Sequence, residues 1–181
     1  MLGNIIVDIV VLGILHQSSV SQEKVITVAK SIVPELWCPT SDFIAGAILR
    51  NLRLGFLTQT VTLPHTLLLT KSGEEQFQNL IASEIDVNEG HSFYAFEAVQ
   101  FCFLDNALPS TAKTVLEYRD ACNSDRLVEL RKRFNQCPND GYFTRIWMGM
   151  EQRRLEAKAD IISEARRICS IECSQPNPNL P

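Results

Sequence analysis

The stretch LLLTKSGEEQFQNLI, Leu67 to Ile81, decides the fold of this chain. Its three consecutive leucines predict a buried strand, and a helical pattern begins directly after Thr-Lys-Ser-Gly. Thr70 is a suitable N-cap for that helix, with Lys71–Gly73 as its first turn and an apolar stripe that continues to Ile85. A strand that runs straight into a capped helix indicates a small mixed domain whose strands precede the helix.

The residues before this stretch predict a hairpin and three helices. Phe56–Val61 and Thr66–Leu69 are rich in Thr, Val and Leu and flank a short loop that contains Pro64, which predicts a two-stranded hairpin. Helical patterns occupy residues 4–16, 22–33 and 43–54, with Gly55 at the end of the third. Three helices, a hairpin and a fourth helix are the order of a winged helix-turn-helix domain.

Everything after Val87–Gly90 reads as helix: residues 91–106, 109–135 (one helix, or two if Asn123–Asp125 breaks it) and 142–170. A turn at Pro138–Gly141 separates the last two segments. The final segment carries a row of residues spaced alternately by four and three: Phe143, Trp147, Met150, Arg154, Ala157, Ile161, Glu164 and Ile168. Such a row suits packing against another long helix.

The predicted fold class is therefore mostly α, with an N-terminal winged helix-turn-helix made of three helices plus a β-hairpin wing and a C-terminal helical domain whose last helix is suited to packing against another long helix, as in a dimerisation domain. We expect the first domain at residues 1–88, the second at 89–171 and a disordered tail at 172–181.

Composition excludes several classes of protein. Hydrophobic residues make up 45% of the 181 residues and charged residues 21%, which indicates a folded chain. No segment reaches the ~20 apolar residues of a membrane helix, and Asp8 interrupts the apolar run Ile5–Leu15. Without a basic N-terminal region, this run predicts a buried helix in a cytoplasmic protein.

The side chains that carry chemistry are scattered. The six cysteines form no CxxC pair, so we expect reduced thiols, and the Cys169–Cys173 pair lacks the further ligands of a metal site. The three histidines match no ligand spacing, and no nucleophile elbow, phosphate loop or dinucleotide fingerprint is present. The sequence therefore predicts a protein that is not an enzyme and has no cofactor and no metal. A Cys–His pair such as Cys38 with His65 is the alternative that the residues leave open, and no motif supports it.

The chain resembles the PadR-like transcriptional regulators over about Val10 to Ile168. Four stretches carry the resemblance: VVLGILHQ, WCPTSDFIAGAILRNLRLGFL, LLLTKSGEEQF and YFTRIWMGMEQRRLEAKADIISE. They are similar to the family's opening helix, to its W-x-P-S segment with the recognition helix, to its L-T-x-x-G motif and to its long last helix. The family's tyrosine in the recognition helix is replaced here by the segment FIAG, and the segment before Gly55 is one residue shorter.

The resemblance implies a homodimeric repressor that binds double-stranded operator DNA and responds to a small-molecule effector. The third helix is then expected in the major groove, with the wing on the DNA backbone. The expected DNA contacts are Thr40, Ser41, Arg50, Arg53, His65 and Lys71. The expected dimer contacts are Phe101, Leu104, Phe143, Trp147, Met150, Ile161 and Ile168. Trp147 has a second interpretation, as the wall of an apolar effector pocket between subunits.

Charge favours an alternative. Residues 1–90 contain five basic and nine acidic residues, which gives −4, the formal net charge of the whole chain, and the wing contains no Arg or Lys. Because affinity for DNA depends largely on cationic contacts to phosphates, an acidic half is unusual for a DNA-binding domain. The alternative is a winged-helix protein-interaction module that has lost DNA binding.

Overall fold

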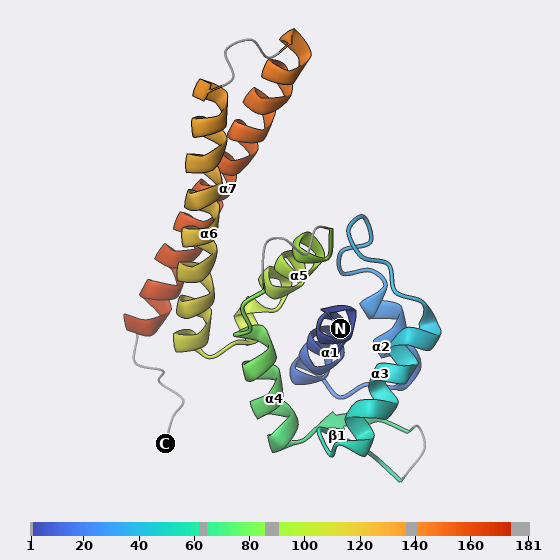
Figure 1. Ribbon diagram of the computed structural model, residues 1–181. Helices are drawn as coiled ribbons and strands as arrows, with labels where there is room; N and C mark the ends of the chain where they lie inside the picture. Colours follow the sequence, from blue (N-terminus) through green and yellow to red (C-terminus); the bar gives the residue numbers. More distant parts are fainter. Residues whose placement is uncertain (1, 62–64, 86–90, 137–140, 175–181) are drawn as a thin grey trace. The chain divides into compact units, whose positions relative to one another are not determined.

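The structure is a computed structural model that describes residues 2–61, 65–85, 91–136 and 141–174 (Figure 1). The contacts divide the chain into two compact units, Met1–Thr111 (unit 1) and Ala112–Pro181 (unit 2). The described residues form seven α-helices, one short 3-10 helix and one antiparallel hairpin, so the expectation of a mostly helical chain with a two-stranded hairpin is confirmed.

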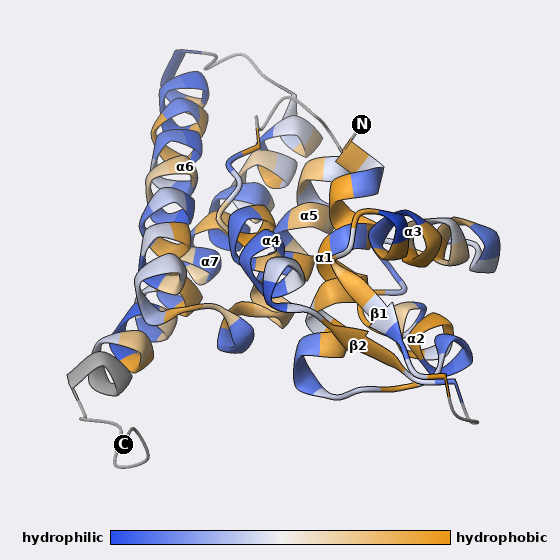
Figure 2. Ribbon diagram, turned by 90° about the horizontal axis from the view of Figure 1, so that it is seen from below, coloured by the Kyte–Doolittle hydropathy of each residue, from blue (hydrophilic) through white to orange (hydrophobic). Residues whose placement is uncertain are grey.

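Helix α1 (Leu2–Gln17) is the centre of unit 1. It packs against α2 (Gln22–Ala29), α3 (Ser41–Arg53), α4 (Lys71–Ile81) and α5 (His91–Cys102). Ten of its residues are buried, and Figure 2 shows its ribbon as predominantly hydrophobic. The apolar run Ile5–Leu15 is therefore explained by burial within unit 1, because other helices cover α1 on several sides.

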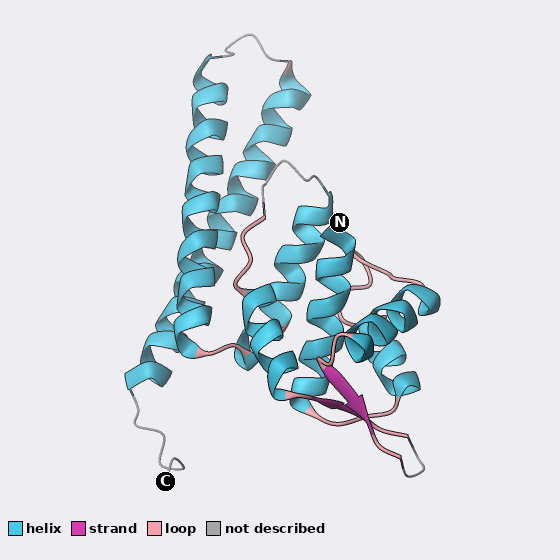
Figure 3. Cartoon of the chain, turned by 60° about the horizontal axis from the view of Figure 1, so that its bottom comes forward, coloured by secondary structure: helices cyan, strands magenta, loops and turns pink. Residues whose placement is uncertain are grey.

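The hairpin joins strands β1 (Leu57–Gln59) and β2 (Leu67–Leu69), with Leu57 opposite Leu69 and Gln59 opposite Leu67 (Figure 3). Leu67 also forms an isolated bridge to Val20, between α1 and α2. Of the three leucines of β2, Leu67 is fully buried and the other two are half-buried. The prediction of a buried strand is therefore correct for Leu67 and too strong for Leu68 and Leu69.

Unit 2 consists of α6 (Pro109–Gln136, whose first three residues belong to unit 1) and α7 (Tyr142–Ser174). The two helices run antiparallel, and Asn123 Nδ2 on α6 donates to the carbonyl oxygen of Leu155 on α7. Ion pairs also join them, among them Arg131–Glu156 and Arg166–Asp120.

Several element boundaries differ from the prediction. Helix α2 ends at Ala29 rather than near residue 33, and α4 ends at Ile81 rather than Ile85. The segment 91–106 divides into α5 and the 3-10 helix η2 (Leu104–Asn106), while α6 is continuous through Asn123–Asp125. Pro64, the Val87–Gly90 boundary, the Pro138–Asp140 part of the turn and the tail from residue 175 lie outside the described residues.

Candidate nucleic-acid interface

The N-terminus of α3 is closed by its own side chains. Thr40 Oγ1 accepts a hydrogen bond from the Phe43 amide at 3.3 Å, as an N-cap residue does. Lys30 Nζ donates to Ser41 Oγ at 2.7 Å, and Asp42 follows in the first turn. Thr40 and Ser41 are exposed as expected, but both hydroxyls already have partners. Lys30, at the end of α2, is a cation at this site that the sequence analysis did not select.

Arg50 is held by α1. Its Nη2 lies 2.7 Å from Asp8 Oδ1, and Asn51 Nδ2 donates to the same oxygen at 2.7 Å. The side chain of Asp8 is 17% exposed, and Asn51 is buried. Arg50 was expected to contact DNA, whereas in the structure it forms an ion pair with Asp8 inside unit 1. The sequence did not predict this pair because the two residues lie far apart along the chain.

Arg53 and Lys71 lie at the base of the hairpin. Both are exposed, and within the described part of the chain neither forms an ion pair. Thr70 Oγ1 and Ser72 Oγ lie 2.8 and 3.1 Å from the carbonyl oxygen of Gly55, just after α3. These bonds join the start of α4 to the end of α3, and thereby gather the two cations at one end of α3.

The Thr-Lys-Ser-Gly sequence has a physical explanation here. Thr70 caps α4 by accepting from the Gly73 amide at 3.1 Å, as predicted. A Cβ at Gly73 would overlap the Phe56 carbonyl oxygen and lie 2.7 Å from Leu69 Cδ1. Glycine is therefore required for the hairpin to approach α4 this closely.

His65 is exposed beside the hairpin loop, and its Nδ1 lies 3.1 Å from the Thr60 carbonyl oxygen. Two bonds between Thr60 and Thr66 close the hairpin at this end: the Thr66 amide donates to Thr60 Oγ1 and the Thr60 amide to the Thr66 carbonyl, both at 2.9 Å. His65 is thus the one titratable group at the described end of a hairpin that carries no Arg or Lys.

The exposed surface of α3 is partly apolar. Phe43 and Leu49 are 38% and 51% exposed, Gly46 between them is exposed, and Leu54 follows at 59%. Base edges in the major groove are read mainly by Arg, Lys, Asn and Gln, and Arg53 is the one such residue that is exposed on this helix.

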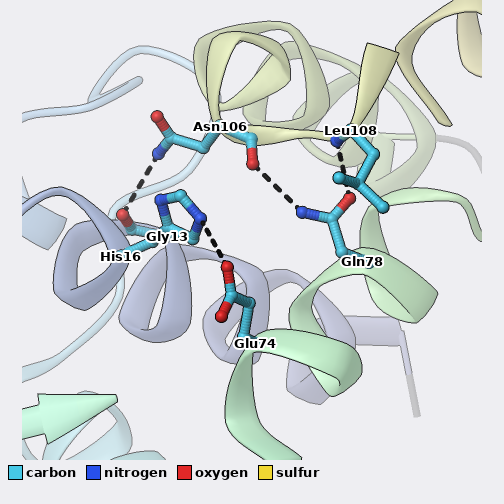
Figure 4. Close-up of polar contacts among 6 residues, drawn as sticks. All are labelled: Gly13, His16, Glu74, Gln78, Asn106 and Leu108. Atoms are coloured by element: carbon cyan, nitrogen blue, oxygen red, sulfur yellow. Dashed lines mark hydrogen bonds and ion pairs between the residues drawn. The ribbon is translucent and has the colours of Figure 1, made fainter. Parts of the chain in front are cut away.

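Polar contacts fix α4 against the neighbouring elements (Figure 4). His16 Nε2 at the end of α1 lies 3.5 Å from Glu74 Oε1, and the His16 ring lies against Phe77. Gln78 Nε2 donates to the Asn106 carbonyl at 3.1 Å, and Asn106 Nδ2 donates to the Gly13 carbonyl at 3.2 Å. The position of Lys71 at the start of α4 is thereby tied to α1 and η2.

A shallow cleft of about 380 Å³ opens beside these contacts. It lies between the end of α1, β2 and the start of α4, and His16, Thr70, Lys71 and Glu74 are among its lining residues. Lys71 and Glu74 contribute opposite charges to its lining, so the cleft does not present a uniform charge to a ligand.

Most of the expected dimer contacts are exposed on α7. The exposed fractions are 81% for Phe143, 56% for Trp147, 64% for Met150, 63% for Ile161 and 46% for Ile168. The other two lie in unit 1, where Phe101 is half-buried and Leu104 is buried in η2. The five expected dimer contacts on α7 are thus all exposed, whereas Phe101 and Leu104 belong to unit 1 and are not part of this exposed row.

Charged side chains within this row have partners along α7. Arg154 forms two hydrogen bonds with Glu151, at 2.6 and 2.8 Å, which hold the pKa of that carboxyl below its usual range. Glu164 is bonded in the same way by Arg167, at 2.7 and 2.8 Å, and its pKa is also lowered. A groove of about 270 Å³ beside Trp147 is lined by Leu130, Leu155 and four charged residues from α6 and α7.

Within the described ranges, no group of three or more His, Cys, Asp or Glu residues is arranged to hold a metal ion. No helix in the same ranges combines the length and the hydropathy that crossing a membrane requires.

No protein-family model matches the sequence, and no curated protein matches it. Solved structures do. The chain is similar to PadR-like transcriptional regulators. The PadR-like regulator BC1756 from Bacillus cereus is 14% identical, with 92% of this chain and 99% of that chain covered and a TM-score of 0.41.

Bacillus subtilis PadR in complex with p-coumaric acid is 11% identical, with coverage of 91% and 96% and a TM-score of 0.43. The same protein in complex with operator DNA is 13% identical, with coverage of 90% and 98% and a TM-score of 0.40. The function of the present chain is inferred from its own residues.

Proposed function

We propose that the chain is a DNA-binding transcriptional regulator, a repressor that acts as a homodimer. In this proposal residues 1–88 are a winged helix-turn-helix domain in which α3 enters the major groove and the β1–β2 hairpin lies along the DNA backbone. Residues 89–171 form the dimerisation domain.

The junction of α3 with the hairpin carries the proposal. Thr70 and Ser72 bond to the carbonyl of Gly55, so exposed Arg53 and Lys71 stand near one end of α3, and Lys30 stands at the other. Cations at both ends of a helix suit contacts to the phosphates on either side of a groove, which position a protein on a duplex. Arg50 then acts by bracing α3 against α1 rather than by contacting DNA.

A small-molecule effector is part of the proposal. The groove beside Trp147 contains an indole, two leucines and both signs of charge, which suits a ligand with an aromatic part and a polar end. Its occupant would be sought by calorimetric titration of small aromatic acids and bases.

The test is a fluorescence anisotropy titration against the protein's own promoter DNA at about 50 and 200 mM salt. We expect binding that weakens with salt. Arg53→Ala with Lys71→Ala removes two phosphate contacts from each protomer, so we expect the slope of log K against log salt to fall by about 4 for the dimer. Lys132→Ala, an exposed cation on α6, is the control and leaves the slope unchanged. Absence of binding at the lower salt concentration would contradict the proposal.

A second candidate is supported by the exposed apolar residues of α3 and by charge. Unit 1 contains five basic and eleven acidic residues, a formal charge of −6, so it repels phosphate at long range. A protein-interaction module would use Phe43, Leu49 and Leu54 as contacts. Activity is measured in cells as the expression of a reporter gene under the protein's own promoter. If this candidate is correct, Leu49→Glu abolishes the regulation of the reporter, while Arg53→Ala with Lys71→Ala leaves it intact. The DNA-binding candidate predicts that the double variant loses the regulation.

A further inference from the structure

Helix α7 carries two rows of residues at heptad spacing. Met148, Leu155 and Ile162 are seven residues apart and buried, and Leu155 lies beside α6, where Asn123 bonds to its carbonyl. The second row is the exposed one, whose apolar members are Phe143, Trp147, Met150, Ala157, Ile161 and Ile168. At 100° per residue the two rows lie on different faces of the helix, so the fold of unit 2 uses the first and leaves the second open.

Two charges of opposite sign interrupt the exposed row. Arg154 and Glu164 are members of the exposed row. Each already forms hydrogen bonds with a residue three positions away, Arg154 with Glu151 and Glu164 with Arg167. Along α7, Glu151 and Arg154 thus form a negative–positive pair, and Glu164 and Arg167 form a second one. A surface of this kind is complementary to itself when one copy is reversed.

We propose that the exposed row of α7 packs against the same row of a second copy in antiparallel orientation, with Arg154 opposite the partner's Glu164. This inference rests on the homodimer of the proposed function and specifies its orientation and register.

Two-fold symmetry tests the spacing. In a symmetric dimer, residue i facing residue j requires that j also faces i. Placing Arg154 opposite the partner's Glu164 places Ala157 opposite the partner's Ile161 and Met150 opposite the partner's Ile168. Every described layer then pairs apolar with apolar or positive with negative.

The charges extend across the interface in the same register. Four side chains of alternating charge then lie next to one another: Glu151, Arg154, the partner's Glu164 and the partner's Arg167. Symmetry repeats this group on the other side of the two-fold axis. Arg154 keeps its bonds to Glu151 and gains a second carboxylate, so the pairing adds opposite charges without breaking the pairs within each helix.

Two other arrangements fit the charges less well. A parallel in-register pair sets Arg154 against the partner's Arg154 and Glu164 against the partner's Glu164, which is unfavourable within a seam. An antiparallel pair shifted by one heptad sets Glu164 against the partner's Trp147 and brings the two copies of Arg154 close together at the axis.

Charge reversal in the full-length chain decides among these arrangements, with the dimer dissociation constant measured by sedimentation equilibrium. The proposed register predicts that Arg154→Glu and Glu164→Arg each weaken the dimer by about tenfold or more. The double variant Arg154→Glu with Glu164→Arg should return to within about threefold of wild type, because the opposite charges meet again with their positions exchanged.

The double variant separates the interface from the helix. Within one helix, the carboxylate introduced at position 154 repels Glu151, and the guanidinium introduced at position 164 repels Arg167. Effects confined to α7 would therefore make the double variant the weakest of all. Recovery in the double variant supports the register, and a double variant weaker than both single variants overturns it.

The remaining outcomes are also decisive. Single variants that dimerise like wild type overturn the register while the homodimer of the proposed function stands. A wild-type chain that is monomeric throughout the concentration range overturns both register and homodimer, and the anisotropy titration then still tests DNA binding separately.

Discussion

At the scale of single residues, one backbone oxygen of the hairpin explains the sequence after β2. The Phe56 carbonyl accepts from the Thr70 amide at 3.1 Å, and Thr70 Oγ1 lies 3.0 Å from it. The same oxygen leaves no room for a side chain at Gly73. The Phe56 carbonyl thus explains both the threonine at position 70 and the glycine at position 73. Gly55, with φ of +75°, supplies the left-handed turn that leads into the hairpin.

Gly73→Ala is therefore expected to destabilise the chain by about 1–3 kcal/mol, because the methyl group meets a fixed carbonyl. Gly46→Ala is the matched control, since Gly46 lies in α3 with nothing within 4 Å of the added Cβ. That change should raise stability by roughly 0.5–1 kcal/mol through helix propensity. Urea unfolding of both variants measures the difference, and two changes of the same sign would contradict this account.

At the scale of elements, the sequence determined the order of helices and strands better than their ends. The capped start of α4 was predicted correctly because Thr70 is a strong local signal, whereas α3 begins at Ser41, two residues before its expected start. The division of 91–106 into α5 and η2 was not predicted, since it depends on contacts of Asn106 with Gly13 and Gln78, far away in sequence. The continuity of α6 through Asn123 likewise depends on α7, to which Asn123 is bonded.

Asn123 predicts how α6 and α7 respond to substitution. It is buried, and its Oδ1 accepts no hydrogen bond from the residues that the structure describes. Replacing a partly satisfied buried amide with an apolar group of similar size is close to neutral or stabilising, so Asn123→Leu should keep or raise the melting temperature. Asn123→Lys places a second positive charge one turn from Arg119, which is also buried, and should cost about 3 kcal/mol or more. Calorimetry compares the two; a lower melting temperature for Asn123→Leu than for Asn123→Lys would contradict this interpretation.

At the scale of the whole molecule, charge and exposed apolar surface are unevenly distributed along the chain. Unit 1 has a formal charge of −6, and unit 2, with twelve basic and ten acidic residues, has +2. The apolar row on α7 was predictable from spacing alone. The pairing of Arg50 with Asp8 was not, because periodicity places a residue on a helix face but does not name the helix opposite.

The exposure of Trp147 gives a test at this scale. On raising the protein concentration, we expect tryptophan emission to shift to shorter wavelength as a second chain covers the indole, which is 56% exposed in the single chain. Trp37→Phe should retain the shift and Trp147→Phe should lose it. An equal shift in both variants would mean that the surface covered on association lies elsewhere.

Asp8 has a mechanical consequence. A single carboxylate oxygen on α1 holds Arg50 and Asn51 on α3, and α1 also touches α2, α4 and α5. We therefore expect a displacement of α1 to reach α3 through this oxygen, and Asp8→Ala to loosen both partners on α3 at once.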